Sequence, residues 1–380
     1  MKPRIIIGNL DCEADLAALH RQTRRRSPLP QRVLATISNA ATLLHVFAED
    51  DDLLWTPVPV DPASMPDVPG LPTPRLVSGP LNELPTGQIL AWAETPAVAA
   101  LRRRQPPEHK PTPPPDLPFH QVLWHLPVPL PEVVARVHHR SFSLRMAQEL
   151  GCALPGARMV ASLANLEAHL KAGGADAGHE GHWVVKAPFS AAGRDRFLVP
   201  GEPGNHRQLE RLFARHGELL FEPWMQRVED FGAGGWVSDD EARVLGAHRL
   251  QVDEAGRFQG IDVPAGGEPW GWLPAAWARS LREAAEHVGR TLRREGYRGP
   301  FGIDAFAYRK EDSEVVFQPV VEVNARLTVG LVARALLAAL HPSVCLRASQ
   351  SLQVRFGTMP SKVEREHREP GYCRSWKIRG

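Results

Sequence analysis

Two acidic side chains and one amide near the end of the chain have the types and spacing that bind a metal cation. Asp304 lies in a run expected to be a strand, residues 301–308, and Glu322 and Asn324 lie in the next one, residues 315–324. Side chains alternate between the faces of a strand, so Glu322 and Asn324 share one face, and antiparallel pairing can bring Asp304 onto it. Two carboxylates and an amide oxygen among apolar neighbours favour a hard cation. These residues therefore predict a Mg²⁺ site, with Mn²⁺ as the alternative ion.

An alternative interpretation needs no metal, since each acid could lie at a strand end exposed to water. That interpretation explains the pair less well, because two buried like charges without a cation repel each other and raise each other's pKa. Arg326 follows the second strand directly before an apolar helix expected at 327–340. Its planar guanidinium suits phosphate or carboxylate oxygens and would add a fixed cation beside the metal.

A lysine at the end of a buried strand and a loop of small residues form a second candidate site. The strand has the sequence WVVK at 183–186, and the loop has SAAGR at 190–194. Small side chains let backbone N–H groups approach phosphate oxygens closely. Taken alone, Lys186 is more simply interpreted as a surface lysine.

The order of these motifs resembles the ATP-grasp superfamily, a carboxylate–amine or carboxylate–thiol ligase-like ATP-binding fold. FGIDAF at 301–306 followed by EVNAR at 322–326 is similar to the metal-binding end of that fold. The resemblance implies that Asp304, Glu322 and Asn324 hold the Mg²⁺ ions that bridge the ATP phosphates. It also implies that Arg326 assists the transferred phosphoryl group or the acyl phosphate.

Three further motifs stand in the order that the superfamily has. WVVKAP at 183–188 resembles the strand whose lysine contacts the phosphates, and the loop after it has one glycine where many members have several. LFEPWM at 220–225 resembles the hinge that holds adenine, where Glu222 would accept from the exocyclic amine and Met225 would offer its amide. Arg140 stands where the family usually has an early lysine.

The resemblance thus implies two groups of site residues besides the metal ligands. The residues expected to bind the nucleotide are Arg140, Lys186, Ser190, Gly193, Arg194, Glu222, Trp224, Met225 and Asp230. The residues expected to act in catalysis are Lys186 and Arg326. The adjacent His138 and His139 have no acidic partner at metal spacing and are interpreted as structural.

By the same resemblance, the expected activity is that of an ATP-dependent ligase. ATP would phosphorylate a small-molecule or peptide carboxylate, and an amine or another nucleophile would attack the acyl phosphate. Two alternatives stay open: a small-molecule kinase or phosphotransferase that releases a stable phosphorylated product, and an ATP-binding module without activity. The arginine at the early lysine position and the single glycine of the loop leave the last alternative open.

The elements that must position these residues alternate between strand and helix. Strands are expected at 5–7, 121–125, 183–186, 219–222, 301–308 and 315–324, helices at 11–21, 141–150, 208–215, 277–292 and 327–340, and an antiparallel meander at 235–263. Residues 57–85 hold too many prolines for a long helix. These elements indicate a multi-domain α/β and α+β protein. The resemblance implies an N-terminal α/β domain of the pre-ATP-grasp kind, followed by a two-lobed ATP-grasp fold with antiparallel sheets and helices.

Composition and motifs divide the chain into five segments. They are an N-terminal α/β domain at 1–105, a proline-rich linker at 106–120, a small lobe with the lysine and the loop at 121–220, a large lobe with the metal site at 221–350, and a basic tail at 351–380. The prolines of the linker favour a stiff, extended connector.

Charge and cysteine content limit the compartment and the partners. The 380 residues carry a formal net charge of +2 and 43% are hydrophobic, which is typical of a soluble globular protein and not of a basic nucleic-acid binder. The four cysteines lie far apart, which favours a reducing compartment over a disulfide framework or a zinc finger. We expect a cytoplasmic protein without nucleic-acid or membrane partners, and we leave a homodimer open.

Overall fold

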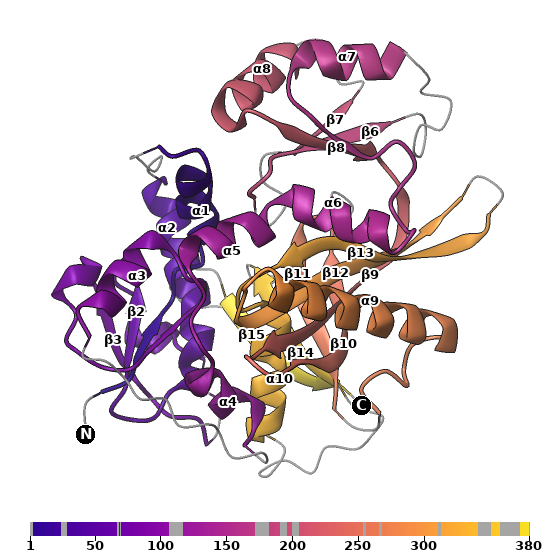
Figure 1. The fold of residues 1–380 in the computed structure, drawn as a ribbon. Coiled ribbons are helices and arrows are strands. Elements are labelled where there is room, and N and C mark those ends of the chain that lie inside the picture. The colour runs from indigo at the N-terminus through magenta and orange to yellow at the C-terminus, as the bar shows by residue number, and fades with distance from the viewer. Residues whose placement is uncertain are drawn as a thin grey trace, which may run out of the picture.

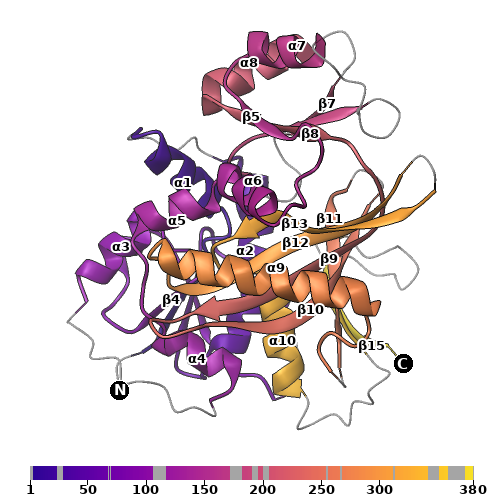
Figure 2. The same cartoon turned by 45° about the vertical axis from the view of Figure 1, so that its right-hand side comes forward.

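A computed structural model arranges the chain around several β-sheets with helices packed on their faces (Figures 1 and 2). It describes residues 3–23, 29–66, 68, 70–105, 117–171, 182–190, 196–199, 205–253, 256–265, 268–310, 313–340, 351–357 and 373–379, with the backbone alone at 205, 355–357 and 373–379. Within these residues the strands form two sheets of four strands and one of seven.

The N-terminal sheet is parallel, with the strand order β3-β2-β1-β4. Its elements are β1 (Ile5–Ile7), α1 (Cys12–His20), α2 (Gln31–Ala41), β2 (Leu53–Thr56), β3 (Arg75–Ser78), β4 (Ile89–Ala91) and α3 (Pro96–Arg103). All three isoleucines of β1 are fully buried, as expected for a strand that is covered on both faces. The turn after β1 requires glycine, because a Cβ on Gly8 would lie 2.5 Å from the Cβ of Ala41 on α2.

Two expectations for the following residues have different outcomes. Residues 57–85 form β3 and the 3₁₀ turns η2 (Pro62–Ser64) and η3 (Leu81–Glu83), so the expectation of short elements is confirmed. The strand expected at 121–125 is wrong, because these residues belong to helix α4 (Phe119–His125). The indole N–H of Trp124 donates to the carbonyl of Phe47, 3.1 Å away, in the 3₁₀ helix η1 (Thr42–Phe47). A short apolar run in a sequence does not distinguish a buried strand from a buried helix. Here the packing of Trp124 against η1 favours the helix.

The second sheet is antiparallel, with the order β5-β8-β6-β7. Its strands are β5 (Arg158–Val160), β6 (Trp183–Lys186), β7 (Arg196–Val199) and β8 (Leu219–Pro223). Helices α7 (Leu163–Lys171) and α8 (Asn205–His216) cover one face (Figure 1), and their Leu166, Leu209 and Leu212 share a core with the strands. Helix α5 (Pro131–His138) packs against α1 of the N-terminal unit, and helix α6 (Arg140–Glu149) lies between the second sheet and the seven-stranded sheet (Figure 1).

The seven-stranded sheet is antiparallel, with the order β13-β12-β9-β10-β11-β14-β15. Its elements are β9 (Gln226–Val237), β10 (Ala242–Val252), β11 (Phe258–Pro264), α9 (Ala275–Arg294), β12 (Gly299–Arg309), β13 (Val315–Asn324), α10 (Val329–Leu340), β14 (Ser351–Gly357) and β15 (Cys373–Arg379). Helix α9 lies across the sheet (Figure 2) and buries Leu281, Val288 and Leu292 against it. Helix α10 shares a core with the N-terminal unit, where Leu331 belongs to the same apolar cluster as Ile6.

The predicted fold class is confirmed: an α/β unit with a parallel sheet precedes units built on antiparallel sheets. The five-segment division remains a prediction, and residues 106–116 of the expected linker and 358–372 of the expected tail lie outside the described residues. Within the described chain, every helix falls short of the length and apolarity that crossing a lipid bilayer requires.

Candidate functional site

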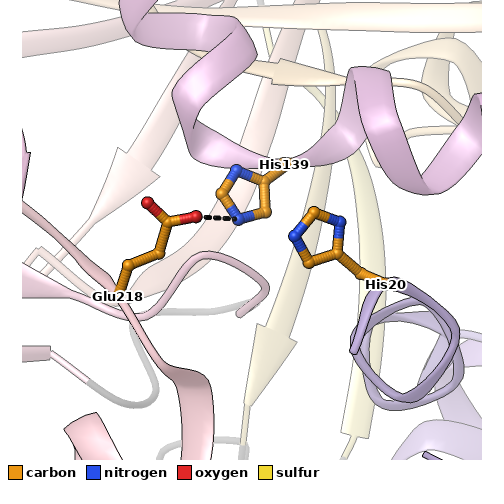
Figure 3. A group of neighbouring side chains, drawn as sticks. All are labelled: His20, His139 and Glu218. Atoms are coloured by element: carbon orange, nitrogen blue, oxygen red, sulfur yellow. Dashed lines mark ion pairs between the residues drawn. The ribbon is translucent and has the colours of Figure 1, made fainter. Parts of the chain in front are cut away.

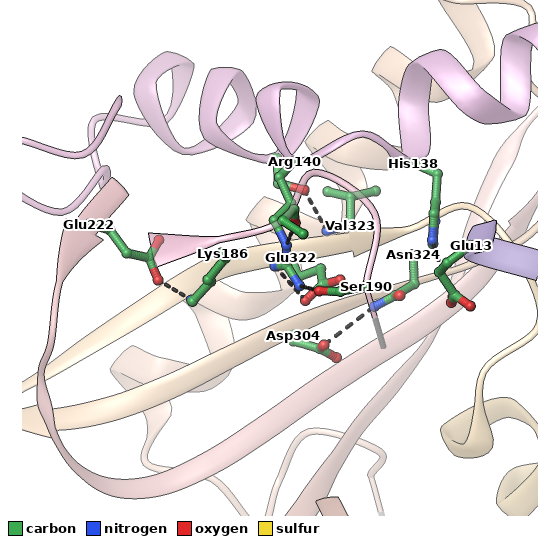
Figure 4. Close-up of polar contacts among 12 residues, drawn as sticks. Glu13, His138, Arg140, Lys186, Ser190, Glu222, Asp304, Glu322, Val323 and Asn324 are labelled. Carbon is green, nitrogen blue, oxygen red and sulfur yellow. Dashed lines mark hydrogen bonds and ion pairs between the residues drawn. The ribbon is translucent and has the colours of Figure 1, made fainter. Parts of the chain in front are cut away.

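The three predicted metal ligands lie side by side on two neighbouring strands. The register of β12 and β13 places Asp304 opposite Glu322 and Gly302 opposite Asn324. The amide nitrogen of Asn324 donates to Asp304 Oδ2 at 3.3 Å. Figure 4 shows the three side chains between Lys186 and Glu13. The strand pairing therefore brings together the side chains that the alternation pattern singled out, and their role as ligands remains a prediction.

The electrostatics of these acids suit a divalent cation. Burial and the neighbouring carboxylate of Glu322 raise the pKa of Asp304 to about 7, although Arg326 and the hydrogen bond from Asn324 act in the opposite direction. A bound cation would remove the repulsion between the two carboxylates. Carboxylate and amide oxygens are the ligands that Mg²⁺ and Mn²⁺ prefer. The donor set therefore fits the predicted ion.

Arg140 connects the acids to the loop after β6. Its Nη1 donates to Glu322 Oε2 at 2.8 Å, its Nη2 to Ser190 Oγ at 3.1 Å, and its Nε to the Ala187 carbonyl at 2.9 Å. The side chain is buried at the start of α6. A guanidinium has five N–H donors, so these three bonds leave donors that a phosphate oxygen can use.

Lys186 and Glu222 form a buried ion pair on the second sheet (Figure 4). Antiparallel β6 and β8 place Lys186 opposite Leu220 and Val184 opposite Glu222, so the two charged side chains are diagonal neighbours on one face. Burial lowers the pKa of the Lys186 ammonium, and Glu222 opposes that shift. Lys186, which is predicted to contact the phosphates, and Glu222, which is predicted to contact adenine, thus bind each other in this structure.

The hinge residues after β8 are half-buried. The amide of Trp224 donates to the carbonyl of His182 at 2.9 Å. The guanidinium groups of Arg196 and Arg227 lie 5.5 and 6.0 Å from the centre of the Trp224 ring. Met225 packs against a small apolar cluster of Leu154 with Phe306 and Tyr308 of β12. Adenine binding by Trp224 and Met225 remains a prediction.

Asp230 lies on β9 in an ion pair that the sequence did not indicate. Its Oδ1 accepts from Arg227 Nη1 at 2.7 Å. Burial raises the pKa of Asp230, and Arg227 opposes that shift. Nucleotide binding by Asp230 remains a prediction. Of the loop expected to cover the phosphates, Ser190 bonds Arg140, whereas Gly193 and Arg194 lie outside the described residues.

An acid of the N-terminal unit reaches Arg326, which sequence reasoning missed. Glu13 on α1 has its Oε1 at 3.2 Å from Arg326 Nη2 and 3.8 Å from His138 Nε2. The Arg326 guanidinium also lies over the Trp92 ring, 5.2 Å from its centre. The expectation that the adjacent histidines have no acidic partner is therefore wrong. No local pattern indicates this contact, because α1 and the end of β13 are brought together only by tertiary packing.

The ion pairs of Glu13 predict a pH-dependent contribution to stability. Burial alone would raise the pKa of Glu13, but Arg326 and His138 lower it to about 2 from its ordinary 4.5. The unfolded chain therefore takes up a proton at a higher pH than the folded chain does. This contribution is complete above the unfolded pKa and is lost as the pH falls toward the folded one.

We expect the free energy of unfolding of the unchanged protein to fall by about 2 kcal/mol more than that of Glu13→Gln between about pH 6 and about pH 3. The variant lacks the titrating group, so the difference between the two curves isolates Glu13. Urea unfolding at a series of pH values measures both. Parallel pH dependences would contradict the assignment.

Comparisons with known proteins give a similarity in sequence to a ligase. No protein-family model matches this sequence. A curated relative from Niallia circulans, a butirosin acyl-carrier protein–L-glutamate ligase, is 27% identical over 148 residues, which are 38% of this chain and 33% of that protein. The chain thus spans about a third of the length of the curated relative it matches.

Several solved structures align with this chain over most of its length. N5-carboxyaminoimidazole ribonucleotide synthetase from Thermus thermophilus has a TM-score of 0.48 and 15% identity, covering 93% of this chain and 83% of that one. The Staphylococcus aureus N5-carboxyaminoimidazole synthetase, solved with ADP, has a TM-score of 0.47 and 9% identity, covering 93% and 82%. An Archaeoglobus fulgidus protein described as ATP-grasp has a TM-score of 0.46 and 13% identity, covering 99% of both chains.

Proposed function

We propose that this chain is an ATP-dependent ligase that activates a carboxylate and joins it to an amine or another nucleophile. The observation that supports this most directly is the convergence of Asp304, Glu322 and Asn324 on β12 and β13, with Arg140 joining Glu322 to Ser190. Oxygen ligands beside buried cationic side chains are what a metal-bound triphosphate requires. The similarity to a protein named as a ligase supports the same reaction class.

In this proposal Asp304, Glu322 and Asn324 hold Mg²⁺ or Mn²⁺. When bound, the ion neutralises charge on the nucleotide phosphates. Arg140 fixes the orientation of Glu322 through the 2.8 Å bond. Asn324 is buried and Asp304 is partly buried, so little bulk water reaches these ligands, which strengthens their electrostatic interactions.

The nucleotide would lie between the second sheet and the end of β12 and β13. Lys186 neutralises phosphate charge, and Glu222 accepts from the adenine amine. The further residues that we assign to the nucleotide are Arg140, Ser190, Gly193, Arg194, Trp224, Met225 and Asp230. Binding of a phosphate to Lys186 loosens its bond to Glu222 and leaves that carboxylate free to turn toward the base.

The reaction that we propose has two steps. A carboxylate oxygen attacks the γ-phosphorus of ATP, the bond from that phosphorus to the ADP oxygen breaks, and an acyl phosphate forms. The nucleophile then attacks the carbonyl carbon, the bond to the phosphate oxygen breaks, inorganic phosphate leaves, and the nucleophile releases a proton to solvent. Positioning and charge neutralisation supply most of the catalysis in such transfers.

Arg326 would bind the reacting carboxyl group in both steps. Its guanidinium lies beside Glu13, and the charges of Glu322 and Asp304 act on it. A planar fork of donors matches the two oxygens of a carboxylate or an acyl phosphate. Glu13 would then be a positioning residue that fixes the direction of that fork.

A screen for ADP release with pairs of carboxylic acids and amines tests this function. We expect magnesium-dependent ADP and inorganic phosphate only when both substrates are present. A stable phosphorylated product from one substrate would instead establish a kinase. ATP binding without turnover across the whole panel would favour a module without activity. A cytoplasmic location and a homodimer belong to the same proposal, and cell fractionation and sedimentation test them.

A further inference from the structure

Two histidines and a glutamate from three different parts of the chain meet outside the proposed nucleotide site (Figure 3). His20 ends α1, His139 lies between α5 and α6, and Glu218 directly precedes β8. Their nearest nitrogen and oxygen ligand atoms all lie within 4.8 Å of one another. The N-terminal unit, the connecting helices and the second sheet thus each supply one ligand atom to a single point.

The buried ring nitrogen of His139 is the feature that indicates a ligand. The side chain is 2% exposed, and its Nε2 makes no hydrogen bond within the described residues, although Glu218 Oε1 lies 3.5 Å away. A buried polar atom without a partner is costly, so such an atom needs a functional or structural explanation. The His20 ring stacks on His139 with centroids 4.6 Å apart and brings a second imidazole beside it.

We propose that His20, His139 and Glu218 form a binding site for a divalent transition metal of the zinc type. Tetrahedral zinc with bonds of about 2.0–2.1 Å separates its ligand atoms by about 3.4 Å. The 3.5 Å between His139 Nε2 and Glu218 Oε1 already matches one edge of that tetrahedron. His20 is exposed, so its side chain can turn to place a ring nitrogen at a third corner of the tetrahedron. Three protein ligands leave the fourth position for water or for an exogenous ligand.

The surroundings of His139 suit an imidazole that binds metal through Nε2. Its Nδ1 lies 2.7 Å from Ser141 Oγ, which can accept the Nδ1 hydrogen and fix the ring. In the metal-free arrangement Nδ1 instead accepts from the Ser141 amide at 3.2 Å, and metal binding replaces that bond. Burial, together with His20 and Arg140, lowers the pKa of His139 to about 4, so the ring is neutral at pH 7, as a metal ligand must be.

This site differs in chemistry from the one on β12 and β13. Imidazole nitrogens favour zinc, copper or nickel, whereas the carboxylate and amide oxygens of the other site favour magnesium. A metal held here would tie the second sheet to the N-terminal unit and restrict their relative movement. The proposal does not depend on ATP binding, so either one can fail without the other.

Metal titration of the full chain tests the site. Zn²⁺ is added in competition with a chromophoric chelator and in excess Mg²⁺, which occupies oxygen-rich sites. We expect one equivalent of Zn²⁺ to bind, and an affinity at least about 100-fold lower in His20→Ala and in Glu218→Gln, because each loses a direct ligand. His206→Ala removes a histidine that pairs with Glu167 at 2.9 Å without a second imidazole, and should bind as the unchanged protein does.

Co²⁺ as a second probe reports the geometry, since its visible absorption is strong only in tetrahedral sites. We expect that absorption in the unchanged protein and in His206→Ala, and its loss in His20→Ala. His20 and Glu218 are partly or fully exposed, so their replacement should not unfold the chain, and circular dichroism checks this. Absence of Zn²⁺ binding, or equal affinity in the unchanged protein, His20→Ala and Glu218→Gln, would overturn the proposal.

Discussion

Asp304→Asn should slow ADP release by at least about 1,000-fold, a loss of about 4 kcal/mol of transition-state stabilisation. The substitution keeps the size of the side chain and removes the charge that the proposed Mg²⁺ site requires. It should not lower the melting temperature, because burial and Glu322 already raise the pKa of Asp304 to about 7 and make a neutral side chain easy to accommodate there. Loss of activity without loss of stability would show that Asp304 acts as a metal ligand and not as a structural residue.

Glu314→Gln is the matched control for this variant. Glu314 lies at the opposite end of the β12–β13 hairpin and pairs with Lys310 on the surface at 2.9 Å. Its replacement should leave ADP release unchanged. Steady-state assays with the substrate pair found in the screen, together with thermal unfolding, measure both variants. An Asp304→Asn protein that retains magnesium-dependent turnover would reject the metal assignment.

Lys186→Met should weaken ATP binding by about 10–100-fold, because a charge-assisted hydrogen bond to phosphate contributes about 1.5–3 kcal/mol. The same substitution should also destabilise the fold by about 3–5 kcal/mol, since it leaves the Glu222 carboxylate buried without its partner. These two effects have different causes. A single variant therefore does not separate them.

The double variant Lys186→Met, Glu222→Gln separates the two effects. Removing both charges should restore most of the stability, because replacement of a buried ion pair by neutral groups is often tolerated. ATP binding should stay weak, because the phosphate contact is still missing. Urea unfolding and calorimetric ATP titration measure the two quantities. Recovery of ATP affinity together with stability would show that Lys186 acts only as the partner of Glu222.

The strands that carry the candidate site could be predicted because their patterns are local. Alternating side chains place Glu322 and Asn324 on one face, and a run of buried residues ends at Lys186. The register itself was not readable in the sequence: pairing that simply continued from the turn would place Asp304 opposite Val320, and a register shift between Asp304 and Phe306 brings Glu322 there instead. Local periodicity and short loops therefore predict the strands and the face that these side chains share, but not which residue lies opposite Asp304.

Contacts between distant elements could not be predicted in the same way. Glu13 reaches Arg326 because α1 packs beside the end of β13, and Glu218 reaches His139 because β8 begins beside α6. Neither acid stands out in its own segment. The ion pair of Lys186 with Glu222 was missed for a different reason: both residues were assigned to the nucleotide, and without it their opposite charges bind each other.

The central claim is that the end of β12 and β13 holds a divalent cation that binds a nucleoside triphosphate. Calorimetric titration with the non-hydrolysable analogue AMP-PNP, with Mg²⁺ and with EDTA, tests it in the unchanged protein, Asp304→Asn and Glu322→Gln. We expect Mg²⁺ to tighten binding by at least about 10-fold in the unchanged protein, equal to about 1.4 kcal/mol, and to have no effect in either variant. Equal affinities with Mg²⁺ and with EDTA in the unchanged protein, or a full Mg²⁺ effect in both variants, would contradict the account.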